Sequence, residues 1–455
     1  MWHSWTDLKY SFMKLWDKGY SVDEKIDRFT VGKDRELDLY LAPFDVLGTM
    51  AHITMLESVG LLGKDELDKL LPELKAIYQT ALDGSFVIED DIEDVHSQVE
   101  LMLTRKLGDL GKKVHTGRSR NDQVMVDLKL FSRAGIERTV KKVKKLFDVL
   151  QARSEQLKDV LMPGYTHLQV AMPSSFGLWF GAYAESLCDD MNMLQAAWKV
   201  TNQNPLGAAA GYGSSAPLNR TLTTELLGFD DLNYNSVYAQ MGRGKTERII
   251  AFAYASVAET LGRLAMDCCL FNSQNFGFVK LPDSLTTGSS IMPHKKNPDV
   301  FELIRAHCNK INGISNSIRL IGTNLPSGYF RDMQIIKEVF IPMFEEMDDC
   351  LDIAVFAIEN MTVAEGLMSD PKYKLAFSVE EVNHRVEQGV PFRDAYKQVG
   401  MEIMDGKFEY HGELHHTHEG SLGNLCNDRI ASKMDRILGG FTFSRVSEAV
   451  ESLLA

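Results

Sequence analysis

The chain has 455 residues, of which 44% are hydrophobic and 25% are charged, a composition typical of a folded globular protein rather than a disordered or fibrous one. Its 49 Lys and Arg against 63 Asp and Glu leave a formal net charge of −14, which argues against nucleic acid or an anionic membrane as a partner.

The cysteines and the first residues indicate the cellular compartment in which the protein is expected. Six cysteines are spread along the chain without a Cys-x-x-Cys pair, a pattern typical of reduced thiols rather than of disulfide or zinc sites. The first residues lack a secretion signal, and no later stretch approaches about 18 uncharged apolar residues. We therefore expect a cytoplasmic protein that no membrane holds.

Proline spacing indicates a mainly α protein built from long helices. Residues 73–162 and 218–281 contain no proline, and alternation of β-branched and polar residues is scarce. We expect three domains: a mostly helical N-terminal domain (1–111), a central bundle of long helices (112–364) and a small helical C-terminal domain (365–455).

Residues 115–122 read His-Thr-Gly-Arg-Ser-Arg-Asn-Asp. Ser119 and Asp122 form a capping pattern ahead of a helix whose apolar residues recur as far as Leu150. Capping does not require Arg118 and Arg120, whose guanidinium groups suit carboxylates. The segment predicts either an anion site or helix initiation alone.

Residues 164–169, Gly-Tyr-Thr-His-Leu-Gln, are predicted to form a loop between two helical runs. His167, beside the hydroxyl of Thr166, is a candidate general acid or base. A structural role is the commoner one for a lone histidine, so both interpretations stay open.

Residues 236–275 predict one long helix that is apolar around more of its circumference than a half-exposed helix would be. Ile249, Phe252 and Leu261 illustrate the spread of its apolar positions. We expect this helix to lie inside a bundle, among helices of its own chain and of neighbouring subunits.

Residues 286–299 combine a hydroxyl-rich loop with a helix start. Asn297 is predicted as the N-cap and Pro298 as the first helical residue. Lys295 and Lys296 beside a helix N-terminus would favour a carboxylate or phosphate. A surface loop with a good cap is the alternative.

Further along, Arg331, Gln334 and Lys337 are spaced three apart and are predicted to share one helix face, either as a binding surface or as a solvated polar stripe. The histidines at 411, 415, 416 and 418 have a spacing that suggests a metal site, but an exposed polar tail is the better interpretation because the segment is rich in Gly and Glu and lacks cysteine.

Taken together, these segments resemble the argininosuccinate lyases of the fumarase/aspartase superfamily. The Gly-Ser-Ser-x-Met-Pro-x-Lys-x-Asn-Pro signature is matched at 288–298, and the segments at 115–122 and 164–169 match in the same order. A fourth match is Glu-Asp-Val-His at 93–96, and the resemblance extends over about residues 34–399.

The resemblance implies a three-domain fumarase/aspartase-like fold with a central long-helix bundle. It also implies reversible anti elimination of argininosuccinate to arginine and fumarate, without a cofactor or a metal. The partners that it implies are the small-molecule substrate and three further copies of the chain, in a homotetramer whose active sites are each shared between subunits.

The resemblance also implies roles for individual residues. Ser289 would be the catalytic base, Lys295 would support it, and His167 would pair with Glu302. The residues implied to bind substrate are Asp94, Ser119, Arg120, Asn121, Thr166, Asn297, Tyr329, Arg331, Gln334 and Lys337.

Some positions depart from the family pattern. Residues 15–20 read Leu-Trp-Asp-Lys-Gly-Tyr where Leu-Trp-Gly-Gly-Arg-Phe is usual, and His294 stands where Gln is usual. Two alternatives to an argininosuccinate lyase follow: another fumarate-releasing lyase, for example one acting on adenylosuccinate, and a non-catalytic crystallin-like relative.

Overall fold

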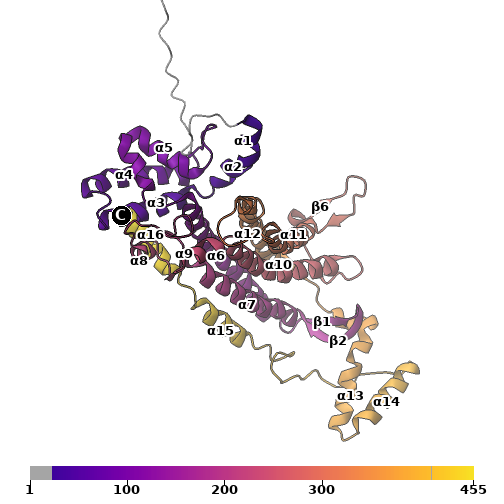
Figure 1. Ribbon diagram of the computed structural model, residues 1–455. Helices are drawn as coiled ribbons and strands as arrows, with labels where there is room; N and C mark the ends of the chain where they lie inside the picture. The colour runs from indigo at the N-terminus through magenta and orange to yellow at the C-terminus, as the bar shows by residue number, and fades with distance from the viewer. Residues whose placement is uncertain (1–22, 411) are drawn as a thin grey trace, which may run out of the picture.

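The computed structural model describes residues 23–410 and 412–455, and these form the mainly α architecture that the sequence predicts (Figure 1). The atypical stretch at 15–20 and His411 lie outside the described residues.

The first helices form a layer at one end of the molecule (Figure 1). From residue 42 onward these helices share a core that includes Leu56, Leu74 and Val99 and also takes in Leu453 from the end of the chain, whereas Leu37 of α2 belongs to the core of the central bundle. The helices of this layer are α1 (Glu24–Val31), α2 (Asp34–Asp38), α3 (Ala42–Ser58), α4 (Lys64–Leu82), α5 (Val95–Leu107) and the 3-10 helix η1 (Gly108–His115).

Five long helices form the centre of the described molecule, and each packs against the next so that α12 returns to α6. Phe344 and Tyr254 are fully buried between them, with ring centroids 5.0 Å apart. The five are α6 (Arg120–Gln156), α7 (Phe176–Thr201), α10 (Lys245–Asn272), α11 (Asp299–Ile321) and α12 (Ile336–Asn360).

Helix α6 confirms the helix predicted after residue 119. Ser119 is its N-cap, and the Ser119 backbone N–H donates to Asp122 Oδ1 at 2.8 Å, which completes the capping box. Gly135 lets α12 approach closely, because a Cβ there would lie 2.2 Å from the ring of Phe344. The cap therefore fixes where α6 begins, and the glycine fixes how it packs.

The single helix predicted over 236–275 is wrong, because the chain breaks at residues 242–244. Helix α9 (Ser236–Met241) ends at Gly242, and α10 begins after Gly244, whose φ of +76° is incompatible with a continuing helix. The expectation of burial is met over much of α10, where Ile250, Tyr254 and Leu261 are at most 1% exposed.

Helix α10 is the one helix among the described residues that is long and apolar enough to cross a membrane by length and composition. Half of its most apolar window is buried inside the molecule, against α7, α11 and α12. Such burial is typical of a core helix in a globular protein.

The strands are short and occur in pairs. Two pairs are antiparallel hairpins, β1 (Leu161–Thr166) with β2 (Gln169–Ser175), and β6 (Thr287–Gly288) with β7 (Lys296–Asn297). The segment predicted as a loop at 164–169 is therefore the tip of a hairpin. The other pairs are β3 (Gln203–Asn204) parallel to β4 (Asp231–Leu232), and β5 (Val279–Lys280) antiparallel to β8 (Thr362–Val363).

The helices after residue 377 pack in two different ways. Helices α13 (Ser378–Glu387) and α14 (Phe392–Met404) share a small core of their own. In contrast, α15 (Asn427–Leu438) packs on α7, and α16 (Phe443–Leu454) packs on α3 and on α8 (Arg220–Leu226). The domain limits at 111 and 364 stay a prediction. The remaining 3-10 helices are η2 (Asp283–Leu285), η3 (Arg331–Ile335), η4 (Leu367–Ser369) and η5 (Pro371–Phe377).

Candidate active site

A cavity of about 170 Å³ lies where α2, α5, α6 and η3 meet. It brings together seven of the residues predicted to bind substrate, which come from three separate stretches of the chain. These seven are Asp94, Arg120, Asn121, Tyr329, Arg331, Gln334 and Lys337. We call this cavity the substrate pocket.

Asp94 and Arg120 form one wall of the substrate pocket. Asp94 is the N-cap of α5, where its Oδ1 accepts the backbone N–H of Ser97 at 2.8 Å. Its Oδ2 lies 3.1 Å from Arg120 Nη1, and the same guanidinium reaches Glu93 at 3.2 Å and the Ser97 hydroxyl at 2.9 Å. The wall therefore presents two carboxylates and one fixed cation.

Lys337 also lines the substrate pocket and is almost fully buried. Its Nζ lies 2.7 Å from Asp34 Oδ1 and 2.7 Å from Asp38 Oδ1. Burial raises the pKa of Asp34 to about 6, since the attraction of Lys337 only partly offsets the loss of water. Burial would lower the pKa of Lys337, but the two carboxylates outweigh it and raise that pKa.

The polar triplet at 331, 334 and 337 shares one face, as predicted, although a 3-10 turn rather than an α-helix carries its first two members. Arg331 Nε donates to Gln334 Oε1 at 2.9 Å, and both side chains donate to the carbonyl of Thr30 at 2.8 Å. Arg331 also pairs with Glu93 at 2.7 Å. These contacts join the end of α1 to the rim of the substrate pocket.

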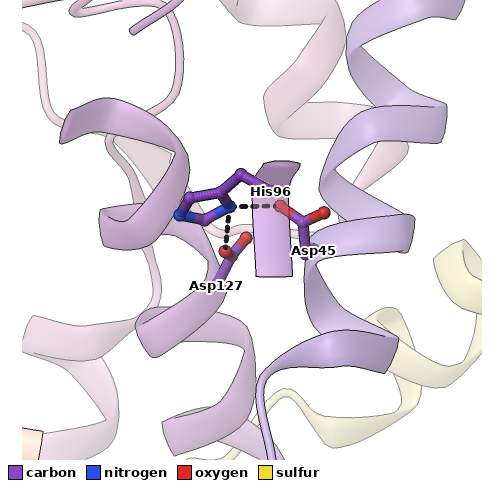
Figure 2. Close-up of side chains that lie close together, drawn as sticks. All are labelled: Asp45, His96 and Asp127. Atoms are coloured by element: carbon purple, nitrogen blue, oxygen red, sulfur yellow. Dashed lines mark hydrogen bonds and ion pairs between the residues drawn. The ribbon is translucent and has the colours of Figure 1, made fainter. Parts of the chain in front are cut away.

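Behind this pocket lies a buried charged cluster of Asp45, His96 and Asp127, which converge from three helices (Figure 2). His96 Nδ1 is 2.7 Å from Asp45 Oδ1 and 3.5 Å from Asp127 Oδ2. Burial would lower the pKa of His96, but Asp45 reverses that effect and raises it. Burial raises the pKa of Asp127 well above its ordinary value, and Asp45 adds to the rise. These directions favour a cationic His96 and a neutral Asp127.

The same three side chains are the group among the described residues whose ligand atoms come within 4.8 Å of one another, as a metal site would require. The positive charge of the buried Arg118 guanidinium acts on both aspartates. The Arg118 charge and the contact with His96 already stabilise the carboxylate of Asp45 without a metal ion. The set therefore fits a bound proton better than a metal ion.

Some residues of the segment 115–122 line the substrate pocket, and others support the fold around it. Arg120 and Asn121 line the substrate pocket, whereas Arg118 is buried behind it. Ser119 serves as the cap of α6, and its Oγ accepts the backbone N–H of Asn121 at 3.2 Å. Burial and the nearby Arg118 lower the pKa of His115 to about 4, so that this histidine is neutral at physiological pH.

The signature loop, residues 289–295, is the tip of the β6–β7 hairpin. Ser289 Oγ accepts the backbone N–H groups of Ile291 at 3.3 Å and Met292 at 3.0 Å. The predicted N-cap at Asn297 is wrong by one residue: Asn297 pairs with Thr287 in the hairpin, so that Pro298 becomes the cap of α11. Lys295 is the last residue of this loop and is exposed.

The tip of the β1–β2 hairpin holds His167. This residue and Leu168 both have positive φ, +55° and +57°, in the turn between the paired Thr166 and Gln169. Positive φ at both central residues is the favoured geometry of a two-residue hairpin turn, although it costs more for residues with a side chain than for Gly. His167 and Thr166 are exposed to solvent.

The structure thus separates the predicted site residues into three groups within one chain. In Figure 1, β6 and the β1–β2 pair lie toward the end of the bundle that is away from α5. Ser289, Lys295 and Asn297 belong to the β6–β7 hairpin, and the exposed Glu302 lies in the first turn of α11 that follows it. His167 and Thr166 belong to the β1–β2 hairpin. The described residues of one chain do not bring His167 and Glu302 together.

The chain is similar to proteins of known family. A family model described as a lyase matches residues 19–313. The chain is 65% identical to the argininosuccinate lyase of Parabacteroides distasonis over 441 residues, which are 97% of this chain and 99% of that protein. The chain belongs to the argininosuccinate lyase family. The argininosuccinate lyase of Thermotoga neapolitana is 36% identical over 388 residues, 85% of this chain and 97% of that protein.

Solved structures confirm the fumarase/aspartase-like fold predicted for this member of the argininosuccinate lyase family. An EDDS lyase variant with bound fumarate has a TM-score of 0.74 and 22% identity, with 95% of this chain and 93% of that chain covered. The class II fumarase of Schistosoma mansoni has a TM-score of 0.65 and 16% identity, with 84% and 93% covered.

Sequence reasoning missed several residues that line the substrate pocket of this argininosuccinate lyase relative. Glu93 and His96 line the pocket and belong to the Glu-Asp-Val-His motif at 93–96, which is the sequence signal for both. Asp34, Asp38 and Arg243 also line the pocket. Their spacing carried no signal, because their partners are distant in sequence.

Proposed function

We propose that this protein is an argininosuccinate lyase, which splits argininosuccinate reversibly into L-arginine and fumarate. Relatives that carry this name match almost the full chain at 64–65% identity. As a family member the protein is a carbon–nitrogen lyase. We place its reaction in arginine biosynthesis in the cytoplasm, and the six free cysteines are consistent with that location.

The charge pattern of the substrate pocket is the observation that carries the proposal. Four acids and four cations line the substrate pocket. The acids are Asp34, Asp38, Glu93 and Asp94. The cations are Arg120, Arg243, Arg331 and Lys337. Argininosuccinate carries both carboxylates and a guanidinium group, so it needs a pocket of both signs. We propose that Arg120, Arg331 and Lys337 hold carboxylates, with Asn121, Tyr329 and Gln334, and that Asp94 lies nearer the arginine end.

The reaction must remove a weakly acidic hydrogen beside a carboxylate and then expel a guanidinium nitrogen. We propose that Ser289 takes this proton. The two backbone N–H groups that point at Ser289 Oγ, together with Lys295 nearby in the loop, would stabilise its deprotonated form. His167, paired with Glu302, and Thr166 would complete the site from the other hairpin, with Ser119 and Asn297 at its edges.

Because these groups are separated within one chain, we propose a homotetramer in which each active site combines three subunits. The bundle supports such an assembly through large apolar side chains that stay exposed on its outer faces. Phe252 on α10 is 59% exposed, Leu303 on α11 is 59% exposed, and Phe356 on α12 is 50% exposed. Faces of this kind are characteristic of subunit interfaces.

The deciding experiment follows fumarate by its absorbance after argininosuccinate is added to the purified protein. We expect steady release without added cofactor or metal. Adenylosuccinate is the matched alternative substrate: turnover of that compound alone would overturn the choice of substrate while keeping the elimination. No turnover of either would favour a non-catalytic relative.

A further inference from the structure

A second cavity, of about 310 Å³, lies beside the substrate pocket, between the start of α10, the end of α11 and the loop at 325–330. Arg243 and Tyr329 line both cavities. None of the roles assigned above uses the rest of this second cavity, which we call the basic cavity.

Three of its exposed side chains are cationic. Lys245, Arg248 and Arg319 line the basic cavity and are exposed. Within the described chain none of the three has a carboxylate partner: Lys245 lies 5.5 Å from the ring centre of Tyr238, and Arg319 donates to the Asn316 amide oxygen at 3.0 Å. In a protein with a net charge of −14, three unneutralised cations in one hollow require an explanation.

A fourth cation lies deeper. Arg243 is 4% exposed; its Nη2 donates to the carbonyl of Met333 at 3.0 Å, and its Nε lies 2.9 Å from Glu247 Oε1. Its buried Nη1 has no hydrogen-bond partner among the described residues. A buried guanidinium N–H without a partner is costly, and a ligand or water in the cavity would satisfy it.

The backbone adds to this field. Helix α10 has 28 residues and begins at the cavity wall, so that the positive end of its dipole faces the hollow. No carboxylate of the described residues lines this cavity. Glu247, in the first turn of α10, forms an ion pair with Arg243, and its Oε2 accepts the backbone N–H of Gly244 at 2.7 Å. The net charge facing the cavity is therefore strongly positive.

We propose that the basic cavity binds a phosphate-type dianion, free or carried by a nucleotide, through Lys245, Arg248 and Arg319. Two guanidinium forks and an ammonium around a helix N-terminus match the several oxygens of a phosphate better than a single carboxylate. Because Arg243 and Tyr329 belong to both cavities, an occupied basic cavity adds negative charge beside the pocket for the anionic substrate. Bound phosphate therefore raises the KM for argininosuccinate.

The test measures binding of inorganic phosphate to the full protein by titration calorimetry, and so does not depend on turnover. We compare the wild type with the double variant Arg248→Gln/Arg319→Gln and with Arg393→Gln, an exposed arginine on α14 as a control. Loss of two charge-assisted contacts should weaken phosphate binding at least about tenfold in the double variant and leave the control unchanged.

A kinetic arm separates this cavity from the substrate pocket. Phosphate should raise the KM of the wild type and of the control but not that of the double variant, whose kcat without phosphate stays normal. Equal phosphate inhibition in all three proteins would place the anion in the substrate pocket and overturn the proposal, as would absence of phosphate binding to the wild type. Adenosine monophosphate in a parallel titration shows whether a nucleotide binds more tightly than the free ion.

Discussion

Lys337 shows how a single residue prepares the substrate pocket. A buried ammonium is tolerable only with close partners, and Asp34 and Asp38 supply two of them at 2.7 Å. Burial nevertheless raises the pKa of Asp34 to about 6, because the attraction of Lys337 only partly offsets the loss of water, and the charge of Asp38 adds to the rise. The cation is thus held in place before any substrate arrives.

Asp34 should make stability depend on pH. Its pKa is about 6 in the folded protein and 3.8 ordinarily, so between about pH 4 and pH 6 the folded state binds more protons than the unfolded state. Stability from this group therefore falls as the pH rises through that window. We expect the free energy of unfolding of the wild type, relative to Asp34→Asn, to decrease from about pH 4 to pH 6 in urea titrations. Asp159→Asn, at an exposed carboxylate, should show no such difference; a flat curve for Asp34→Asn against wild type would contradict the assignment.

Ser289 and its neighbour Ser290 offer a matched pair for testing the base. Ser289→Ala should lower kcat by about two orders of magnitude or more, the scale of an essential acid or base group. Ser290→Ala removes the adjacent hydroxyl and should retain most activity. Fumarate release at saturating argininosuccinate measures both, and near-normal kcat in Ser289→Ala would exclude it as the base.

At the scale of elements, the β1–β2 hairpin keeps a strained turn. Leu168 has a φ of +57°, a conformation that costs a residue with a side chain about 1 kcal/mol or more relative to Gly. Leu168→Gly should therefore slow hydrogen exchange of the hairpin amides near Tyr165 and Val170. Leu168→Ala keeps the Cβ and should bring no gain. Equal exchange in both variants would mean that the turn carries no strain.

The elements also show what spacing along the chain can predict. Helix α6 was predictable because its cap and its apolar period lie within one continuous stretch. The break before α10 was not predictable from the apolar pattern, because apolar residues continue on both sides of the turn at residues 242–244, where Gly244 has a positive φ. The ion pairs of Lys337 were missed because about 300 residues separate the partners, and local patterns carry no record of such contacts.

At the scale of the whole molecule, Phe252 tests the assembly. It is 59% exposed on the outer face of α10, where a neighbouring subunit would bury it. Phe252→Asp should shift the protein to smaller species in size-exclusion chromatography with light scattering and reduce activity in parallel. Phe392→Asp, at a side chain that is 54% exposed on α14, should leave the assembly intact. An unchanged mass for Phe252→Asp would exclude this face from the interface.

Mixing inactive variants tests whether sites are shared. If Ser289 and Arg120 of one site come from different subunits, refolding Ser289→Ala together with Arg120→Ala should restore about a quarter of wild-type activity, because random assembly leaves that share of sites intact. Each variant refolded alone should stay inactive. No recovery in the mixture would show that both residues of a site come from one chain.

The length of helix α6 sets the distance between the residues at its two ends. At the rise of an α-helix its 37 residues span about 55 Å, far more than the length of an amino-acid-sized ligand. One end of this rod carries Arg120, and the other leads into the hairpin that carries His167. If each active site combines subunits as proposed, the length of this helix sets the distance between neighbouring sites, and deleting whole turns from its middle would move the sites closer together while leaving the side chains of each one unchanged.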